Sequence, residues 1–343
     1  MKASLDQILT EGSVMIIDGS MSTALENLGA DLNNDLWTAM VLADHPELVR
    51  LVHLEYLRAG ADCGITCSYQ ASVPGYMKHG FTQKEAEDLI RRSVALFLEA
   101  RDQWWEEEGN ASGRSYPLCL GSVGPYGAYL ANGSEYSGNY RIGEKALRDF
   151  HLRRMQLLHE AGADLLLIET QPSLEEVLVE AEIVEELGAD FWVSFSCRDG
   201  RRISSGGRIA DCAKALAGRF PHLRMIGVNC TKPEDTASLI RELKAASGLP
   251  VAAYPNSGDT YDPETKTWVK RTGGPDFESY ALSFLQAGAC AVGGCCTTTA
   301  EHVSACVRAR ERFLSGESTA FRDAGPVKMS PPQALPERGK RIQ

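Results

Sequence analysis

The sequence predicts a closed barrel of eight parallel strands, each followed by a helix. Short, almost wholly apolar runs alternate with amphipathic stretches along the chain, a pattern typical of parallel strands that are buried on both faces. A helix, an Ala-Gly-Ala turn and a strand also recur as a unit, at Ala59–Ala61, Ala161–Ala163 and Ala287–Ala289. The glycine of such a turn can adopt the left-handed conformation that ends a helix. Eight β-then-α units predict a (β/α)₈, or TIM, barrel.

Eight segments have the composition of the expected strands. In chain order they are Val14–Asp18, Cys63–Ser68, Leu118–Val123, Asp164–Thr170, Phe191–Ser196, Met225–Cys230, Pro250–Pro255 and Cys290–Cys295. A doubly wound open sheet is the main rival architecture. No G-x-G-x-x-G follows the first strand, so the dinucleotide-binding version of that rival lacks its fingerprint.

The segments between the strands have the apolar spacing of helices. Pro46–Ala59 shows it most clearly, with apolar residues three and four positions apart. Capping boxes, in which an N-terminal Asp, Ser or Thr precedes a Glu by three residues, are predicted at Asp44, Thr82 and Ser173. The segment Gly124–Gly143, rich in Gly, Tyr, Asn and Ser, is unusually long for a βα loop, and long loops are often functional.

Composition and charge limit the possible functions. The chain has 343 residues, 43% of them hydrophobic, and a net charge of −11, which argues against nucleic acid or an anionic membrane as a partner. We find neither a signal peptide nor a membrane-spanning run, so we expect a cytoplasmic protein whose ten cysteines are reduced. No linker divides residues 1–314, which we expect to form one barrel domain, followed by an extended or disordered tail at 315–343. The oligomeric state is not indicated.

Active sites of such barrels lie at the C-terminal ends of the strands. Several chemically capable side chains stand at these predicted ends: Asp18, Ser68, Tyr69, Gln70, Glu169, Asn229, Cys230, Tyr254, Asn256, Ser257, Cys295 and Cys296. Polar groups in such positions are costly to desolvate unless they are paired or used.

Three cysteines are the most informative of these residues. Cys230 precedes Cys295 and Cys296 by 65 and 66 residues, which excludes a sequence-local zinc finger, but the barrel brings their strands to one mouth. Three thiolates can hold Zn²⁺ tetrahedrally and leave a fourth position open, the catalytic arrangement rather than the structural one. A thiol substrate suits that position. The competing interpretation is that these cysteines only fill space in the core, as buried cysteines often do.

Two carboxylates form the second feature. Asp18 and Glu169 are candidates for recognising an ammonium group, and the backbone N–H groups of Gly19 and Ser20 are available to a carboxylate. Helix capping or a salt bridge at the barrel rim would explain the same two acids. The seven histidines form no metal-binding cluster in the sequence, and those within predicted helices are expected to be surface or packing residues.

At these residues the chain resembles the homocysteine S-methyltransferases. The segments that carry the resemblance are Ile17–Met21, Gly227–Cys230 and Gly293–Cys296, in an order that matches from about Val14 to Arg310. Five further stretches resemble the subgroup that uses S-methylmethionine or S-adenosylmethionine: Leu36–Ala39, Ser68–Ala71, Gly121–Tyr129, Gly133–Tyr136 and Tyr254–Gly258. Ser20, Ser22, Thr297 and Ala300 depart from the family's usual residues, and Thr297 leaves the donor preference open.

The resemblance implies a zinc-dependent enzyme of methionine biosynthesis. It implies Zn²⁺ on Cys230, Cys295 and Cys296, with the homocysteine amino group on Asp18 and Glu169 and its carboxylate near Gly19 and Ser20. Substrate-lining roles for Tyr69, Gln70, Asn229 and Asn256 also follow from it. The substrates would be homocysteine and a sulfonium methyl donor, and the homocysteine thiolate would displace the leaving sulfur in line.

Three other interpretations stay open at this stage. The acceptor could be selenocysteine or another thiol in the same chemistry. A metal-independent barrel lyase or isomerase could use Asp18 and Glu169 as acid and base. A zinc-binding or redox-sensing protein without turnover would use the three cysteines alone.

Overall fold

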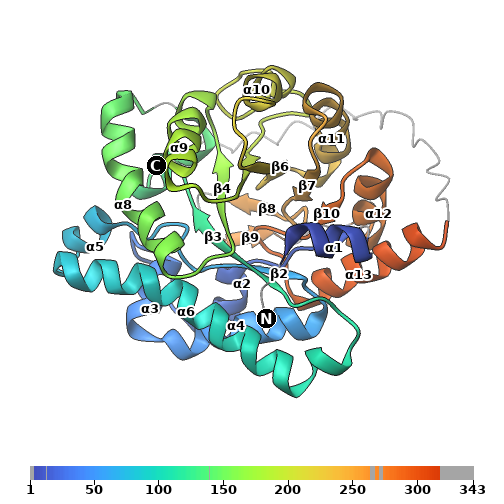
Figure 1. Cartoon of the computed structure of the whole chain (residues 1–343), viewed down its shortest axis with the longest axis horizontal. Coiled ribbons are helices and arrows are strands. Elements are labelled where there is room, and N and C mark those ends of the chain that lie inside the picture. Colours follow the sequence, from blue (N-terminus) through green and yellow to red (C-terminus); the bar gives the residue numbers. More distant parts are fainter. Residues whose placement is uncertain (1–3, 13, 139, 263–266, 270–272, 317–343) are drawn as a thin grey trace, which may run out of the picture.

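The structure, a computed structural model, describes residues 4–12, 14–138, 140–262, 267–269 and 273–316. Its central sheet has eight parallel strands in the order β1-β10-β7-β6-β5-β4-β3-β2, surrounded by helices (Figure 1). This confirms the predicted barrel. The strands are β1 Met15–Ile16, β2 Cys63–Ile65, β3 Leu118–Val123, β4 Leu165–Gln171, β5 Phe191–Phe195, β6 Leu223–Asn229, β7 Val251–Tyr254 and β10 Ala291–Val292.

The helices occupy the outside of the barrel. They are α1 Leu5–Gly12, α2 Met21–Asn27, α3 Thr38–Asp44, α4 Pro46–Ala59, α5 Val73–Lys78, α6 Gln83–Glu107, α7 Tyr126–Leu130, α8 Glu144–Glu160, α9 Leu174–Leu187, α10 Ile209–Leu216, α11 Pro233–Ser247, α12 Phe277–Ala287 and α13 Ala300–Leu314. Short 3₁₀ turns lie at η1 Gly109–Ala111 and η2 Ser134–Tyr136.

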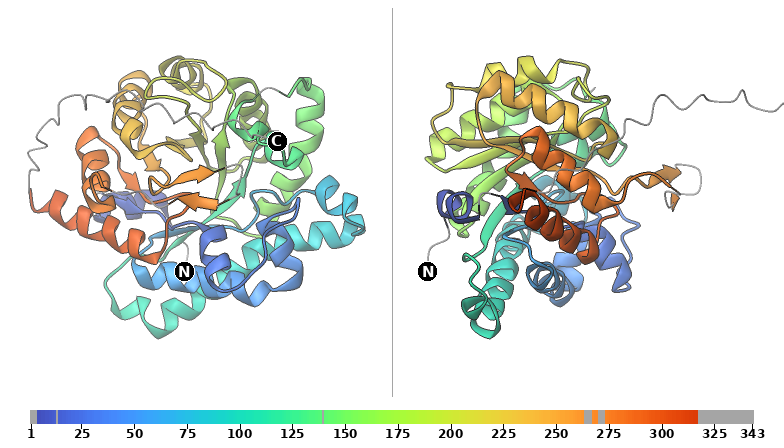
Figure 2. Two further views of the ribbon diagram at one scale, coloured as in Figure 1. Left: turned by 180° about the vertical axis from the view of Figure 1, so that it is seen from behind. Right: turned by 90° about the vertical axis from the view of Figure 1, so that its right-hand side faces the viewer.

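One antiparallel hairpin was not predicted. Strands β8 Thr260–Asp262 and β9 Thr267–Val269 pair with each other, and the hairpin projects from the body of the barrel (Figure 2, right). The predicted tail at 315–343 lies outside the described residues, apart from Ser315 and Gly316 directly after α13. None of the helices in the described ranges combines the length and the apolar character that a membrane crossing requires.

The Ala-Gly-Ala turns end helices as predicted. Gly60 and Gly288 follow α4 and α12 with φ values of 114° and 108°, a backbone region that residues with a side chain rarely adopt. The predicted capping boxes at Thr82 and Asp44 differ in outcome. The box at Thr82 is confirmed, but the one at Asp44 is wrong, because Asp44 is the last residue of α3 and α4 begins at Pro46 without a side-chain cap.

The barrel closes between β1 and β2 through one backbone hydrogen bond and two hydrogen bonds to aspartate side chains, without a regular ladder in the described residues. The Asp62 N–H donates to Ile16 O (2.7 Å), and the Ile16 N–H donates back to Asp62 Oδ2 (2.8 Å). Nearer the C-terminal ends of these strands, the Ile65 N–H donates to Asp18 Oδ2 (2.9 Å). We call these three hydrogen bonds the β1–β2 seam. Arg310 Nη1 also donates to Asp62 Oδ2 (2.8 Å), so the seam is tied to α13.

Two apolar layers follow from the alternation of side chains along the strands. The smaller cluster fills the interior of the barrel around Trp192, Met225 and Tyr254, and Leu5 and Ile8 of α1 join it from one end. The larger cluster lies between the strands and the ring of helices. The interior is therefore packed with side chains, and the space available for a substrate lies at its mouth.

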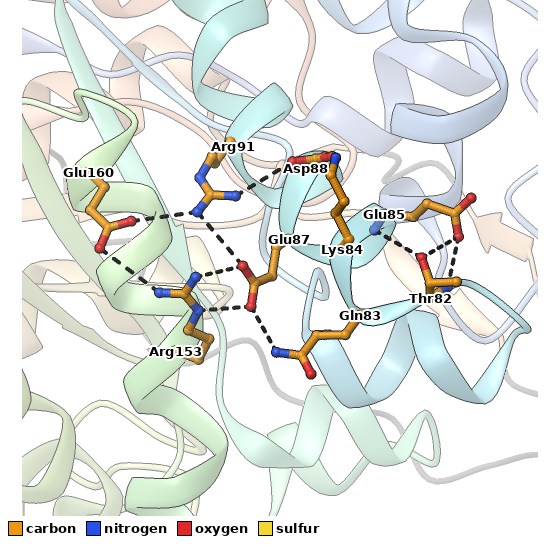
Figure 3. Close-up of polar contacts among 9 residues, drawn as sticks. All are labelled: Thr82, Gln83, Lys84, Glu85, Glu87, Asp88, Arg91, Arg153 and Glu160. Carbon is orange, nitrogen blue, oxygen red and sulfur yellow. Dashed lines mark hydrogen bonds and ion pairs between the residues drawn. The ribbon is translucent and has the colours of Figure 1, made fainter.

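Ion pairs join neighbouring helices on the outside of this ring. Arg153 of α8 forms a bidentate pair with Glu87 of α6, at 2.9 and 2.5 Å, and Arg91 bridges to Glu160 at 3.6 Å (Figure 3). The capping box of Thr82 and Glu85 begins the same helix (Figure 3). Pairs between partly exposed side chains contribute about 1 kcal/mol or less each, so they orient α6 against α8 more than they stabilise the fold.

Candidate metal centre and substrate cavity

The three predicted cysteines meet at the mouth of the barrel. Cys230 follows β6, and Cys295 and Cys296 follow β10, with only β7 between these strands in the sheet. The Cys230 sulfur lies 2.6 Å from that of Cys295 and 3.6 Å from that of Cys296. All three sulfur atoms lie within 4.8 Å of one another.

The backbone at Cys230 is held in an unusual conformation. Its φ of 47° lies in the left-handed region, which costs free energy for a residue with a side chain and recurs at functional sites. Neighbouring loops hold this geometry: the Asn256 N–H donates to Thr231 O (3.1 Å) and the Cys295 N–H to Pro255 O (2.8 Å). The strained turn directs the Cys230 thiol toward the other two.

The chemistry of the three sulfurs fits a metal cation. Hydrogen bonds from Cys230 and Cys295 hold the pKa of the Cys296 thiol well below its ordinary value, which favours the thiolate form that a metal cation binds. In a tetrahedral zinc site with Zn–S bonds of about 2.3 Å, the sulfurs stand about 3.8 Å apart. The Cys230–Cys296 separation is close to this value, and Cys295 has to move away from Cys230 by about 1 Å.

A cavity of about 1000 Å³ opens beside the sulfurs. Its charged lining residues are all acidic, and in the described part of the chain no Lys, Arg or His lines it. The four acids are Glu26, Asp31, Glu135 and Glu169. A concave surface that carries one sign of charge attracts the opposite sign, so this cavity favours a cationic ligand.

The two predicted carboxylates lie at the inner end of this region. Glu169 accepts from Ser122 Oγ (2.5 Å) and Tyr254 OH (3.2 Å), and burial, together with the Cys295 thiol, raises its pKa to about 8. Burial also raises the pKa of Asp18, with a further contribution from Glu169. Asp18 uses Oδ2 in the β1–β2 seam, whereas Oδ1 is buried without a hydrogen-bond partner. No basic side chain among the described residues contributes to the pKa of either acid, so the pair can accept an ammonium group.

The backbone at Gly19 and Ser20 also reaches the cavity. A side chain at Gly19 would come within 2.9 Å of the Tyr56 ring, so only glycine fits there. The Ser20 N–H donates to Thr298 Oγ1 (3.1 Å), and its hydroxyl caps α2 by accepting from the Thr23 N–H (3.2 Å). Ser20 is therefore already engaged in local structure.

The four expected lining residues differ in their placement. Tyr69, Gln70 and Asn256 line the cavity, and Gln70 Nε2 donates to Ala128 O (3.1 Å) in the long loop. Asn229 is fully buried and does not line the cavity. Its Oδ1 accepts from the Thr170 N–H (2.9 Å) and its Nδ2 donates to Thr170 Oγ1 (2.7 Å), which links β6 to the end of β4.

Comparisons with known proteins identify the family of this chain. The family model described as homocysteine S-methyltransferase matches residues 15–310. The chain belongs to the homocysteine S-methyltransferase family. It is 44% identical to homocysteine S-methyltransferase YbgG of Bacillus subtilis (strain 168), over 87% of this chain and 95% of that one. It is 40% identical to homocysteine S-methyltransferase 1 of Arabidopsis thaliana, over 90% and 96% of the two chains.

A solved structure shows the same fold. The metallated form of the homocysteine methyltransferase MmuM from Escherichia coli superimposes with a TM-score of 0.79 at 38% identity, covering 88% of this chain and 98% of that chain. The family and these relatives support homocysteine S-methyltransferase activity for this chain.

Sequence reasoning missed a buried polar cluster beneath the Gly124–Gly143 loop. His151 Nε2 lies 2.8 Å from Glu176 Oε1, which also accepts from the Tyr126 N–H (2.5 Å), and Tyr140 OH donates to the same carboxylate. Arg154 donates to Gly124 O. Both ends of the loop are thus anchored to α8 and α9, and the unusual length of the loop was the only signal in the sequence.

Glu135 and Tyr136 were not predicted as site residues either, although their motif was noted. They belong to η2 within the long loop, and both line the cavity beside the cysteines. Tyr136 is half exposed and lines the cavity together with Cys230, Cys295 and Cys296. The barrel rule considers only the residues that directly follow strands. Glu135 and Tyr136 are far in sequence from every strand end, so the rule could not predict them.

Proposed function

We propose that the protein transfers a methyl group from a sulfonium donor, S-methylmethionine or S-adenosylmethionine, to homocysteine, with Zn²⁺ on Cys230, Cys295 and Cys296. The observation that carries the proposal is a cluster of three thiols in a cavity whose charged lining is wholly acidic. A sulfonium is a permanent cation, so this cavity favours it over an anionic methyl donor.

The bound zinc would supply a Lewis acid that keeps the homocysteine sulfur deprotonated near neutral pH. Asp18 Oδ1 and the Glu169 carboxylate would hold the homocysteine ammonium group, which supplies the positive charge that these two buried acids lack. The backbone around Gly19 and Ser20 would lie beside its carboxylate. Tyr69, Gln70 and Asn256 would line the donor side of the same cavity.

The reaction is a direct displacement. The deprotonated sulfur of homocysteine forms a bond to the methyl carbon, and the bond from that carbon to the sulfonium sulfur breaks with its electron pair. The thiolate and the sulfonium both become neutral thioethers, and no proton has to reach the leaving group. The protein's contribution is to align three atoms in line and to exclude water, since charge disappears in the transition state. With S-methylmethionine, both products are methionine.

The deciding experiment measures methionine formation from homocysteine and S-methylmethionine, together with the zinc content, before and after chelation. Activity that disappears with zinc and returns when zinc is added back supports the proposal. Turnover that survives complete removal of zinc contradicts it. Zinc without turnover on either sulfonium donor shows that the donor has been wrongly assigned, and parallel assays with selenocysteine and other thiols test the acceptor.

A further inference from the structure

Glu135 is a half-buried acid in the cavity that the reaction scheme above does not use. It belongs to the turn η2, between α7 and α8, and one of its carboxylate oxygens is inaccessible to solvent and has no hydrogen-bond partner. Burial raises its pKa, and none of the described residues that line the cavity is basic. An ionised carboxylate in such a place is costly unless a cation pairs with it. The cavity therefore lacks the partner that Glu135 requires.

The position of Glu135 separates it from the pair proposed for homocysteine. Tyr69 lines the same cavity as Glu135, Glu169 and Cys230. Burial raises the pKa of its phenol, and the Cys230 thiol and the two acids raise it further. Glu169 comes from β4 in the barrel, whereas Glu135 comes from the loop above it. Asp18 and Glu169 thus lie on the barrel side of the three sulfurs, and Glu135 lies on the loop side.

The turn that presents Glu135 is packed in a fixed position. A side chain at Gly127 of α7 would come within 2.5 Å of the Glu135 backbone nitrogen, so α7 and the turn touch directly. The loop that contains both elements is anchored at Tyr126 and Tyr140 to Glu176. A carboxylate on such a turn is held in place before a ligand arrives, which reduces the conformational entropy that binding costs.

We infer that Glu135 binds the ammonium group of the methyl donor and thereby selects sulfonium donors that are amino acids. This inference rests on the proposed function. The ammonium is a better partner than the sulfonium, because the sulfonium charge disappears in the reaction. A carboxylate bound to the sulfonium would stabilise the ground state more than the transition state and slow the transfer. The ammonium charge is the same in both states, so pairing with it lowers the donor KM and leaves kcat unchanged.

The test replaces Glu135 with Gln and compares two donors. One is S-methylmethionine, and the other is 3-(dimethylsulfonio)propionate, a sulfonium acid without an amino group, which is assayed as a substrate or as a competitive inhibitor. We expect E135Q to raise the KM for S-methylmethionine by about 10- to 100-fold, the range for a lost hydrogen bond between charged groups. The kcat, the KM for homocysteine and the affinity for the ammonium-free donor should each change by less than about threefold.

Two further variants serve as controls. Glu144→Gln removes the same charge from an exposed residue that begins α8, directly after the same loop, and does not line the cavity. It should leave both donors unaffected. Glu135→Asp retains the charge on a shorter side chain and should restore part of the affinity for S-methylmethionine. Circular dichroism and zinc content establish that each variant is folded and loaded.

Equal losses with both donors, an unchanged donor KM, or an effect on the KM for homocysteine instead would each overturn the role of Glu135. If E135Q does not fold, E135D decides by the same comparison: a raised KM confined to S-methylmethionine supports the role, and an equal change with both donors overturns it. A wild-type protein that accepts no sulfonium donor would instead refute the proposed function itself.

Discussion

Replacing Asp62 with Asn should weaken the barrel at the β1–β2 seam without altering the catalytic groups. The Asp62 side chain is 7% exposed, and its Oδ2 accepts from the Ile16 N–H and from Arg310 Nη1, both at 2.8 Å. Its Oδ1 lies 3.5 Å from Arg114 Nη2. Asn has nearly the same shape, but it has one acceptor oxygen instead of two and no charge. It can keep the bond to Ile16 only by leaving Arg310 without an anionic partner.

The expected cost follows from the burial of these groups. Removing one partner of a buried ion pair costs about 3–5 kcal/mol, and a hydrogen bond to a charged group contributes about 1.5–3 kcal/mol. The Arg310 and Arg114 side chains are 18% and 21% exposed, so water can partly replace the lost carboxylate. We therefore expect D62N to lower the free energy of unfolding by about 2–3 kcal/mol.

Asp164 offers a matched control within the same barrel. Its Oδ2 accepts from the Cys119 N–H and from Arg101 Nη1, both at 2.8 Å, so the local geometry is the same. Strands β3 and β4, however, also share a regular ladder from Leu120↔Leu165 to Val123↔Ile168, whereas no such ladder joins β1 to β2 in the described residues. D164N should therefore cost about 1 kcal/mol less than D62N.

Urea denaturation followed by circular dichroism measures the difference between the two variants. Hydrogen exchange adds a local measurement: amide protection at Ile16 and Ile65 should fall in D62N and stay unchanged in D164N. Equal losses of stability in the two variants, or a loss below about 0.5 kcal/mol in D62N, would refute the idea that aspartate side chains close this barrel.

Three further outcomes are expected. Cys296→Ala should lose zinc and methyl transfer together, because only two of the three sulfurs remain. The unfolding midpoint of the zinc-free protein should stay the same. A zinc-free variant with full activity would contradict the mechanism. Asp18→Ala should raise the KM for homocysteine, because Asp18 Oδ1 has no hydrogen-bond partner among the described residues and is available to the substrate. Zinc should be retained, because Asp18 is not one of the proposed ligands. Loss of zinc would show that Asp18 has a different role. His53 is buried with both ring nitrogens unpaired, and burial lowers its pKa from 6.5 to about 3. The unfolded chain then binds the proton first, so the stability contributed by neutral His53 is complete above about pH 6.5 and falls as the pH drops toward 3. His53→Leu should remove about 2 kcal/mol of the stability lost between pH 7 and pH 5, as measured by urea denaturation at both values, and equal pH dependence in the two proteins would argue against it.

The strands and their order could be predicted from the sequence because burial on both faces leaves a local signature. All eight predicted strands are present, and the barrel rule places Cys230, Cys295 and Cys296 at one mouth, where the structure also has them. The predicted bounds of β1 and β10 were too long. These strands have only two residues each in the sheet, because the chain leaves the ladder early to form the seam and the cysteine turn.

The position of a site residue could be predicted from the sequence, but the direction of its side chain could not. Residues at strand ends could be found by position alone, which is why Glu169, Tyr69 and Asn256 were predicted and do line the cavity. Asn229 met the same rule but is fully buried and does not line the cavity. Its amide pairs with Thr170 at the end of β4, and its Nδ2 lies 3.9 Å from Cys295 Sγ. A strand end specifies where the backbone goes, and packing then decides which way a side chain faces.

By itself the sequence determined the barrel, the order of its strands and the meeting of three thiols, because these follow from periodicity and from the ends of parallel strands. Only the tertiary structure decided that aspartates close the seam, that Glu135 reaches the cavity, and that His151 and Glu176 anchor the loop. These contacts join residues 25 to 47 positions apart through side chains, or bring a loop over a site formed by distant strands. Such contacts depend on the three-dimensional distance between side chains, which no local pattern of residues records.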